Sequence, residues 1–277
     1  MLWVVATPIG NLEDITLRAL RLLREVDLVL AEDTRRTRKL LTHFEIPGPL
    51  EPFHAHSDEG RVAALVRRLQ SGESMALVSD AGTPLVSDPG IRLVAAAREA
   101  GVPVSVAPGA SAVLTALAGA GLRAERFRFL GFPPRAGGKR GRFLDSVAAD
   151  PAAQVLYEAP GRTPALLRDL ATRLGARRVA LCRELTKLHE EFRVGSATEL
   201  AGAAEAAGDA IRGEVTLVVE ADDEAGAPEP LDDDALAAFV KARLAAGERP
   251  KAIAKALAAR QGISGSEAYA RVEALRD

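Results

Sequence analysis

The chain has 277 residues, of which 48% are hydrophobic and 27% are charged, and its formal net charge at pH 7 is −2. This length suits two domains with a small appendage, and the apolar content is sufficient for a substantial core, which excludes global disorder. The small net charge argues against a protein that binds polyanions over its whole surface, although a local basic patch is compatible with it.

The cysteine and histidine content limits the chemistry further. Cys182 is the only cysteine, so an intrachain disulfide and a cysteine-based zinc site are excluded, and its V-A-L-C context is typical of a buried strand. None of the four histidines shows the H-E-x-x-H spacing, and we predict no metal.

The first residues, M-L-W-V-V-A-T-P, carry no basic leader and predict a strand rather than a signal peptide. The long uncharged run at 100–122 is interrupted by Pro103, Pro108 and Gly109, so a strand, a turn and a helix explain it better than a membrane span does. We therefore expect a cytoplasmic protein without a membrane partner.

Short apolar runs alternate with helical patterns through the first half of the chain. Apolar residues recur at helical spacing within 16–25, 62–69 and 93–97. The expected strands are 2–5, 27–31, 76–79 and 102–106. This alternation predicts an N-terminal α/β domain, 1–118, with a mostly parallel sheet covered by helices on both faces.

A second α/β domain is predicted for 119–223. It contains expected helices near 162–174 and 197–207, and its expected strands are 127–131, 155–158, 179–182 and 215–220. The polar segment 221–230 has the composition of a linker.

Residues 232–277 show no strand pattern and predict three short helices. Ser264, followed three residues later by Glu267, fits a capping box at the start of the third helix. Glycine-containing turns between short helices resemble a helix-turn-helix unit. We expect this small helical domain either to assist RNA or ribosome docking or to serve as a stabilising cap.

Three loops follow predicted strands and have an unusual composition: A-T-P-I-G-N (6–11), V-S-D-A-G-T-P-L-V-S-D-P-G (78–90) and A-P-G-A-S-A (107–112). In open α/β sheets, ligands bind beyond the carboxyl ends of the strands. Asp80 supplies a carboxylate there, and Ser111 begins a helix whose first N–H groups are available. A single loop of this kind would be an ordinary tight turn, but three at corresponding strand ends favour a binding cleft.

Two other glycine patterns do not indicate nucleotide sites. The segment G-A-G-L-R-A (119–124) follows a helical pattern instead of a strand, which removes the context that a dinucleotide fingerprint needs. Gly138-Lys139 lacks the first glycine of a P-loop, because residue 133 is proline.

Six segments together carry a specific resemblance: A-T-P-I-G-N-L-E-D-I-T (6–16), A-E-D-T-R-R-T (31–37), S-D-A-G-T-P-L-V-S-D-P-G (79–90), L-Y-E-A-P-G-R (156–162), R-E-L-T-K-L-H-E-E (183–191) and G-E-V-T-L-V-V-E (213–220). In this order they resemble the tetrapyrrole methylase superfamily and, within it, the family that methylates the 2′-oxygen of a cytidine in the decoding region of 16S rRNA. The resemblance extends from residue 2 to the C-terminal tail.

The resemblance implies a tetrapyrrole-methylase fold with S-adenosylmethionine bound between two α/β domains, mostly by main-chain groups, and it implies a homodimer. The residues that it places at the cofactor are Pro8, Ile9, Gly10, Asp80, Gly82, Thr83, Ser111 and Ala112, with Tyr157 and Glu158 closing the cleft from the second domain.

An rRNA substrate in the small ribosomal subunit requires local positive charge. Seven basic residues and one acidic residue lie between Arg123 and Arg142. Phe132 or Tyr157 could stack an unpaired base. We expect RNA contacts from Arg35, Arg36, Arg38 and Lys39, which follow the second expected strand, and from Arg162 in the second domain. The alternative is that these charges form a solvated face.

Methyl transfer from a sulfonium is a direct displacement, so the enzyme mainly aligns the reacting atoms. A ribose hydroxyl is a poor nucleophile, and a base or a cation near the developing alkoxide would assist. The charged residues considered for these roles are Glu32, Asp33, Glu158, Glu190, Lys187 and Arg162. From them we select Asp33, Glu158 and Lys187 as catalytic candidates, against the alternative that each forms a surface ion pair.

Two other functions compete with this one. A methyltransferase of the same fold could act on a corrinoid or another small molecule, but the arginine-rich segments fit an apolar macrocycle poorly. A non-catalytic RNA-binding module would need no cofactor cleft at the strand ends.

Overall fold

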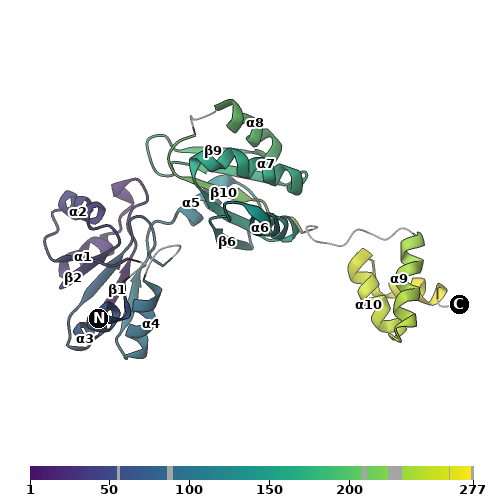
Figure 1. The fold of residues 1–277 in the computed structure, drawn as a ribbon, viewed down its shortest axis with the longest axis horizontal. Helices are drawn as coiled ribbons and strands as arrows, with labels where there is room; N and C mark the ends of the chain where they lie inside the picture. The colour runs from purple at the N-terminus through teal and green to yellow at the C-terminus, as the bar shows by residue number, and fades with distance from the viewer. Residues whose placement is uncertain (55–56, 86–89, 208–210, 224–232, 262, 276–277) are drawn as a thin grey trace. The chain divides into compact units, whose positions relative to one another are not determined.

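The structure is a computed structural model that describes residues 1–54, 57–85, 90–207, 211–223, 233–261 and 263–275. The end of the 79–90 loop and most of the predicted linker at 221–230 lie outside the described residues. Internal contacts divide the chain into two compact units, Met1–Val147 with Ala152–Ala221, and Ala148–Pro151 with Asp222–Asp277. The first unit contains two five-stranded sheets, and the second contains three helices (Figure 1).

The first sheet is entirely parallel, as predicted, with the strand order β3-β2-β4-β1-β5. Trp3 is opposite both Ala76 and Ser105, which fixes the register of β1 against its two neighbours, β4 and β5. The strands are β1 (Leu2–Val5), β2 (Leu28–Ala31), β3 (Leu50–Pro52), β4 (Met75–Val78) and β5 (Val104–Ala107).

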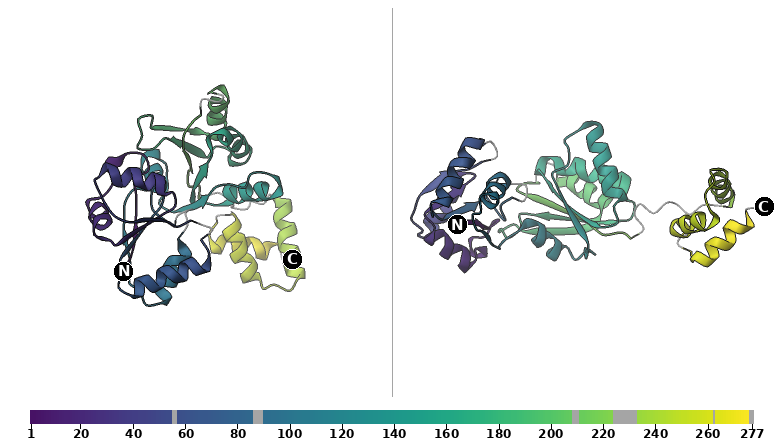
Figure 2. Two further views of the ribbon diagram at one scale, coloured as in Figure 1. Left: turned by 60° about the vertical axis from the view of Figure 1, so that its left-hand side comes forward. Right: turned by 90° about the horizontal axis from the view of Figure 1, so that it is seen from below.

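Both faces of this sheet are covered, because its strands are apolar on both sides. Leu28 and Leu30 of β2 pack in the core beneath α3 and α4, whereas Val29 and Ala31 pack beneath α1 and α2. Figure 2 shows these helix pairs on opposite sides of the strands. The helices are α1 (Leu17–Glu25), α2 (Thr34–His43), α3 (Glu59–Gln70) and α4 (Ile91–Glu99).

The second sheet has the order β6-β7-β10-β8-β9, and only β6 and β7 are parallel in it. Its strands are β6 (Phe127–Gly131), β7 (Ala153–Glu158), β8 (Arg178–Arg183), β9 (Glu191–Ser196) and β10 (Val215–Val219). Its helices are α6 (Gly137–Ala149), α7 (Thr163–Leu174) and α8 (Ala197–Ala207), with the 3-10 turn η2 (Pro160–Arg162) before α7.

Helix α5 (Ala112–Ala120) connects the two sheets. Its buried residues Val113 and Ala116 share a core cluster with Val155, Cys182 and Val218 of the second sheet. The predicted boundary between residues 118 and 119 therefore falls inside a helix that packs on the second sheet. Burial raises the pKa of the Cys182 thiol to about 12, in keeping with a structural strand residue.

The second unit consists of α9 (Asp233–Ala245), α10 (Pro250–Gln261) and α11 (Gly265–Ala274), as the sequence predicted. Ser264 caps α11 by accepting a hydrogen bond from the backbone N–H of Glu267, which confirms the predicted start of that helix. Val240, Ile253, Leu257 and Val272 form its core. None of the described helices combines the length and apolarity that crossing a membrane requires.

Candidate functional site

Three loops at the carboxyl edge of the first sheet are joined to one another. The backbone N–H of Thr7 donates to the carbonyl of Gly82 at 2.9 Å, and the N–H of Gly82 donates back to Thr7 at 3.0 Å. The hydroxyl of Thr83 then donates to the carbonyl of Ala110 at 3.2 Å. The sequence placed these loops at corresponding strand ends, and the structure brings them together.

Two glycines permit this close approach. Gly82 has φ +79°, and a Cβ atom added to it would lie 3.3 Å from Cγ2 of Ile9. A Cβ atom on Gly109 would lie 2.9 Å from the Cβ of Ala6. A side chain at Gly109 would therefore push its loop away from Ala6, and one at Gly82 would crowd Ile9 and strain the backbone.

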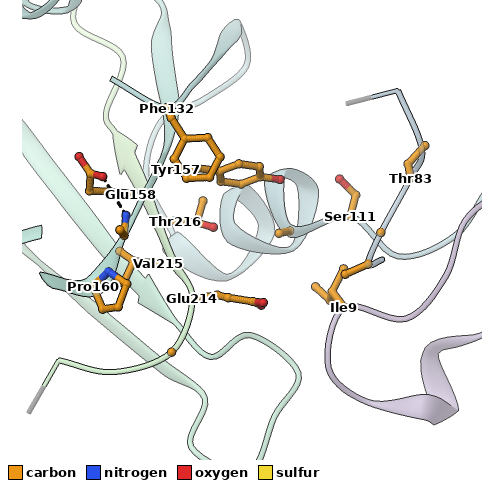
Figure 3. Close-up of a pocket in the computed structure, with 15 residues that line it drawn as sticks. Ile9, Thr83, Ser111, Phe132, Tyr157, Glu158, Pro160, Glu214, Val215 and Thr216 are labelled. Carbon is orange, nitrogen blue, oxygen red and sulfur yellow. Dashed lines mark hydrogen bonds between the residues drawn. The ribbon is translucent and has the colours of Figure 1, made fainter. Parts of the chain in front are cut away.

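A cavity of about 330 Å³ opens beside these loops and is lined from both sheets of the first unit (Figure 3). Its volume is at the lower end of the range for small-molecule sites. The lining residues are Ile9, Ala81, Gly82, Thr83, Ser111, Ala112, Phe132, Tyr157, Glu158, Ala159, Pro160, Gly213, Glu214, Val215 and Thr216.

Aromatic rings form one wall of the cavity. The ring of Tyr157 packs edge-on against Phe129, with centroids 4.8 Å apart, and it lies 5.5 Å from the ring of Phe132. Phe132 is 56% exposed even though it lines the cavity. Phe132 therefore presents an aromatic face both to the cavity and to solvent.

Glu158 contributes its backbone to the cavity, but its carboxylate points away from Tyr157 (Figure 3). Successive side chains of a strand face opposite sides, so the two neighbours diverge. Oε1 of Glu158 accepts hydrogen bonds from the N–H of Ala159 at 2.8 Å and from Nε of Arg162 at 2.7 Å. Oε2 is buried and has no hydrogen-bond partner among the described residues. The Glu158 side chain thus holds the turn that forms the cavity wall.

Asp80 and Pro8 line a separate, smaller hollow of about 180 Å³, together with Arg36 and Lys39 of α2. Oδ1 of Asp80 accepts a hydrogen bond from the backbone N–H of Asp33 at 2.9 Å, and its Oδ2 lies 3.6 Å from Arg36. Asp80 therefore joins the loop after β4 to the beginning of α2.

Asp33 is the N-cap of α2. Its carboxylate accepts hydrogen bonds from the backbone N–H and from the guanidinium of Arg35. These bonds, the side-chain one above all, hold the pKa of Asp33 far below its usual value. A carboxylate with so low a pKa is a weak proton acceptor near pH 7.

Lys187 lies between two carboxylates, one of which belongs to a residue that lines the cavity. Its Nζ is 2.8 Å from Oε1 of Glu184 and 3.1 Å from Oε2 of the cavity residue Glu214. Partial burial lowers the pKa of Lys187, but these two hydrogen bonds outweigh that effect, and the pKa is raised above its usual 10.5. The ammonium is thus charged at neutral pH and already paired.

The same loop contacts the predicted cofactor residue Gly10. A Cβ atom on Gly10 would overlap the side chain of Lys187 and lie 3.0 Å from the carbonyl oxygen of Leu185. The N–H of the next residue, Asn11, donates to Oγ1 of Thr186 at 3.1 Å. Gly10 therefore lies where the two sheets meet, behind the cavity residue Ile9.

The predicted site residues thus divide into three groups. Among the predicted cofactor residues, the cavity is lined by Ile9, Gly82, Thr83, Ser111, Ala112, Tyr157 and Glu158, whereas Pro8 and Asp80 line the smaller hollow and Gly10 contacts Lys187. The catalytic candidates Asp33, Glu158 and Lys187 are not brought to one point. Four of the five predicted RNA-contacting residues have exposed side chains on α2: Arg35, Arg36, Arg38 and Lys39. The fifth, Arg162, pairs with Glu158.

Residues 213–216 also line the cavity, although the sequence did not predict them as site residues. Strand β10 is antiparallel to β7 and β8, so its amino end lies beside their carboxyl ends, with Val215 opposite both Glu158 and Arg183. The amino end of an antiparallel strand is not among the carboxyl ends of parallel strands, where the sequence predicted the site. Within the described part of the chain, no cluster of three or more His, Cys, Asp or Glu side chains could hold a metal ion.

Comparison with known proteins identifies the class to which this chain and its fold belong. The family model of tetrapyrrole (corrin/porphyrin) methylases matches residues 1–201. A solved uroporphyrin-III C-methyl transferase from Thermus thermophilus, complexed with S-adenyl homocysteine, is 23% identical with a TM-score of 0.55, covering 79% of this chain and 96% of that one. The class is therefore a methyltransferase with the tetrapyrrole methylase fold.

Curated relatives narrow the class. Ribosomal RNA small subunit methyltransferase I of Halalkalibacterium halodurans is 43% identical over 270 residues, which cover 97% of this chain and 93% of the relative. The protein of that name from Micromonospora olivasterospora is 48% identical over 237 residues, covering 86% of this chain and 74% of the relative. The chain belongs to the ribosomal RNA small subunit methyltransferase I family.

Proposed function

We propose that this protein transfers a methyl group from S-adenosylmethionine to the 2′-hydroxyl of a cytidine in the decoding region of small-subunit rRNA. Family membership supports rRNA methylation, and the six sequence segments resemble the cytidine 2′-O-methylating family. The observation that carries the proposal is the cavity beside the three joined loops, which is lined by seven of the residues that the resemblance places at the cofactor.

The cavity fits such a donor by its construction. Gly82 leaves room where a Cβ atom would press against Ile9, and Ser111 begins α5, whose first N–H groups can bind a polar group. A thermophilic relative in fold carries S-adenyl homocysteine. Ile9, Gly82, Thr83, Ser111, Ala112 and Tyr157 would hold the donor, which supplies an electrophilic methyl group when bound.

The RNA would approach where basic side chains adjoin the cavity. Phe132 is exposed at its wall and is followed by the exposed residues Arg135, Lys139 and Arg142. A base unstacked from the RNA gains about 1–3 kcal/mol by stacking on an aromatic ring. The exposed cations of α2 would contact phosphates beside the smaller hollow.

In this proposal, the catalytic candidates Glu158 and Lys187 position other residues of the cavity and do not touch the reacting atoms. Glu158 holds the turn at Ala159, and Lys187 holds Glu214 at the cavity rim. Positioning of reacting groups contributes a large part of the rate of a direct displacement. We further propose a homodimer in the cytoplasm, on the family resemblance and the location of the rRNA substrate.

Calorimetry with S-adenosylmethionine tests the donor assignment by comparing the wild type with the Gly82→Val variant, in which the cavity is obstructed. The wild type should bind at micromolar donor concentrations, whereas the variant, with its extra methyl groups against Ile9, should not. Absence of binding by the wild type, or equal binding by both proteins, would refute the assignment.

A further inference from the structure

The helical unit at the C-terminus has a basic face that its own folding does not explain. Helix α10 buries Ile253, Ala254 and Leu257 in the core of this unit. Its exposed side carries Lys251 and Lys255, which are one helical turn apart, and Arg249 is exposed immediately before the helix. No acidic residue occurs in α10.

Two carboxylates of this unit are engaged by other cations. Glu248 pairs with Arg243 at 3.1 Å, and Glu267 pairs with Arg271 at 2.9 Å. Among the described residues, no carboxylate pairs with Arg249, Lys251 or Lys255. The exposed side of α10 therefore carries positive charge that no carboxylate of the helix itself offsets.

Helix stability does not account for these positions. Lys251 lies in the first turn of α10, where the helix dipole disfavours a cation. Cations at a helix amino end instead add to the attraction that its N–H groups have for an anion. The position of Lys251 is therefore unfavourable for the helix alone and favourable for a bound phosphate.

We infer that Arg249, Lys251 and Lys255 form a phosphate-binding face for RNA, here called the α10 basic face. This inference rests on the proposed function, because it gives the rRNA substrate a second contact surface beyond the methylation cavity. Lys251 and Lys255 are about 6 Å apart along the helix axis, so each can meet a different phosphate. The apolar side of α10 is already used in the core, which argues against insertion into a lipid surface.

The test is a double substitution, Lys251→Gln with Lys255→Gln, in the full-length chain. Affinity for a small-subunit rRNA fragment is measured by fluorescence anisotropy at several salt concentrations. Each lost phosphate contact lowers the slope of log affinity against log salt by about 0.7–0.9, so the slope should fall by about 1.4–1.8, with an affinity loss of roughly tenfold at low salt.

The matched control is Arg243→Gln with Arg271→Gln, which removes the same charge from the same unit at cations that are already paired. Thermal unfolding checks that both variants fold, and the single variants Lys255→Gln and Arg271→Gln repeat the comparison if the Arg243 change unfolds the unit. An equal loss in control and test variants, or no change in the test variant, overturns the inference.

Calorimetry with S-adenosylmethionine separates this inference from the proposed function. Unchanged donor affinity with weakened RNA binding in the Lys251→Gln, Lys255→Gln variant supports the α10 basic face. If the wild type binds donor and RNA, and the variant binds RNA equally well, only the α10 basic face is refuted. If the wild type binds neither ligand, both proposals fail.

Discussion

The ammonium of Lys187 lies 3.1 Å from the carboxylate of Glu214, and this ion pair joins the loop behind Gly10 to the rim of the cavity. Glu184 completes the cluster, since it accepts hydrogen bonds from Lys187 and from the backbone N–H of Glu214 at 3.0 Å. Lys187 is therefore a positioning residue in this account, although the sequence suggested a catalytic cation.

Replacing Lys187 by Met should weaken donor binding and leave turnover nearly unchanged when donor is saturating. A partly exposed ion pair contributes about 1 kcal/mol, so donor affinity should fall roughly fivefold. Calorimetry gives the donor affinity, and steady-state methylation of rRNA gives kcat. Lys187→Arg, which keeps the charge, should restore most of the affinity. A kcat reduced a hundredfold with unchanged donor affinity would instead indicate that Lys187 acts on the reacting atoms.

The stabilisation from this cluster should depend on pH in a defined window. The hydrogen bond from Lys187, above all, holds the pKa of Glu184 below 4.5, so its contribution is present above pH 4.5 and is lost as pH falls through the lower folded-state pKa. The raised pKa of Lys187 keeps its contribution below pH 10.5 and removes it at higher pH.

We therefore expect the difference in unfolding free energy between wild type and Lys187→Met to be constant from about pH 6 to pH 9 and to shrink in acid. Denaturant unfolding at several pH values measures it, and the comparison cancels the other titrating groups. A difference that changes near neutral pH would contradict the assigned ion pairs.

Gly10→Ala should disturb the junction of the two sheets. The added methyl group would meet Lys187 and the backbone carbonyl of Leu185, and overpacking of this kind costs about 1–3 kcal/mol. We expect a lower melting temperature and weaker donor binding. Gly141→Ala is the matched control, because it lies within α6 with nothing near its added methyl group and should stabilise the helix. Equal effects of both changes would exclude a special role for Gly10.

Asp80→Ala should weaken donor binding indirectly, since it releases the Gly82 loop from the backbone of Asp33. A loss of roughly two- to tenfold is expected for one hydrogen bond of about 1 kcal/mol. Arg36→Ala removes only the ion pair to Asp80 and should spare donor affinity while weakening RNA binding. Calorimetry and RNA anisotropy on both variants decide this, and unchanged donor affinity in Asp80→Ala would disprove the link.

Phe132→Ala should raise KM for rRNA about tenfold, because loss of one aromatic stacking partner costs about 1–3 kcal/mol. The ring is exposed at the cavity wall, so its removal creates no large core cavity. Phe132→Tyr keeps the ring and should behave like wild type. If KM for rRNA stays constant and only donor affinity changes, the ring serves the donor and not the base.

The sequence predicted the strands well, because β1 and β6 have the expected bounds and the other expected strands begin and end within two residues of the observed ones. It did not reveal β3 and β9. Both are edge strands, and β3 is only three residues long and ends in a proline. Helix α2, T-R-R-T-R-K-L-L-T-H, was also not predicted, because its many charged residues leave only a short apolar stripe.

For the site, local patterns predicted which loops converge but not where each side chain points. Glu158 follows Tyr157 in β7, so only one of the two can face the cavity, and pairing with Arg162 places the carboxylate on the far side. The contribution of Glu214 depends on an antiparallel neighbour, which is a property of the sheet and not of the segment.

The most direct test is mass spectrometry of small-subunit rRNA from a strain lacking this protein, compared with the same strain carrying the wild-type gene or the Gly82→Val variant. The account predicts that one 2′-O-methylcytidine in the decoding region disappears in the deletion strain, returns with the wild type and does not return with the variant. An unchanged pattern of ribose methylation in the deletion strain would contradict it.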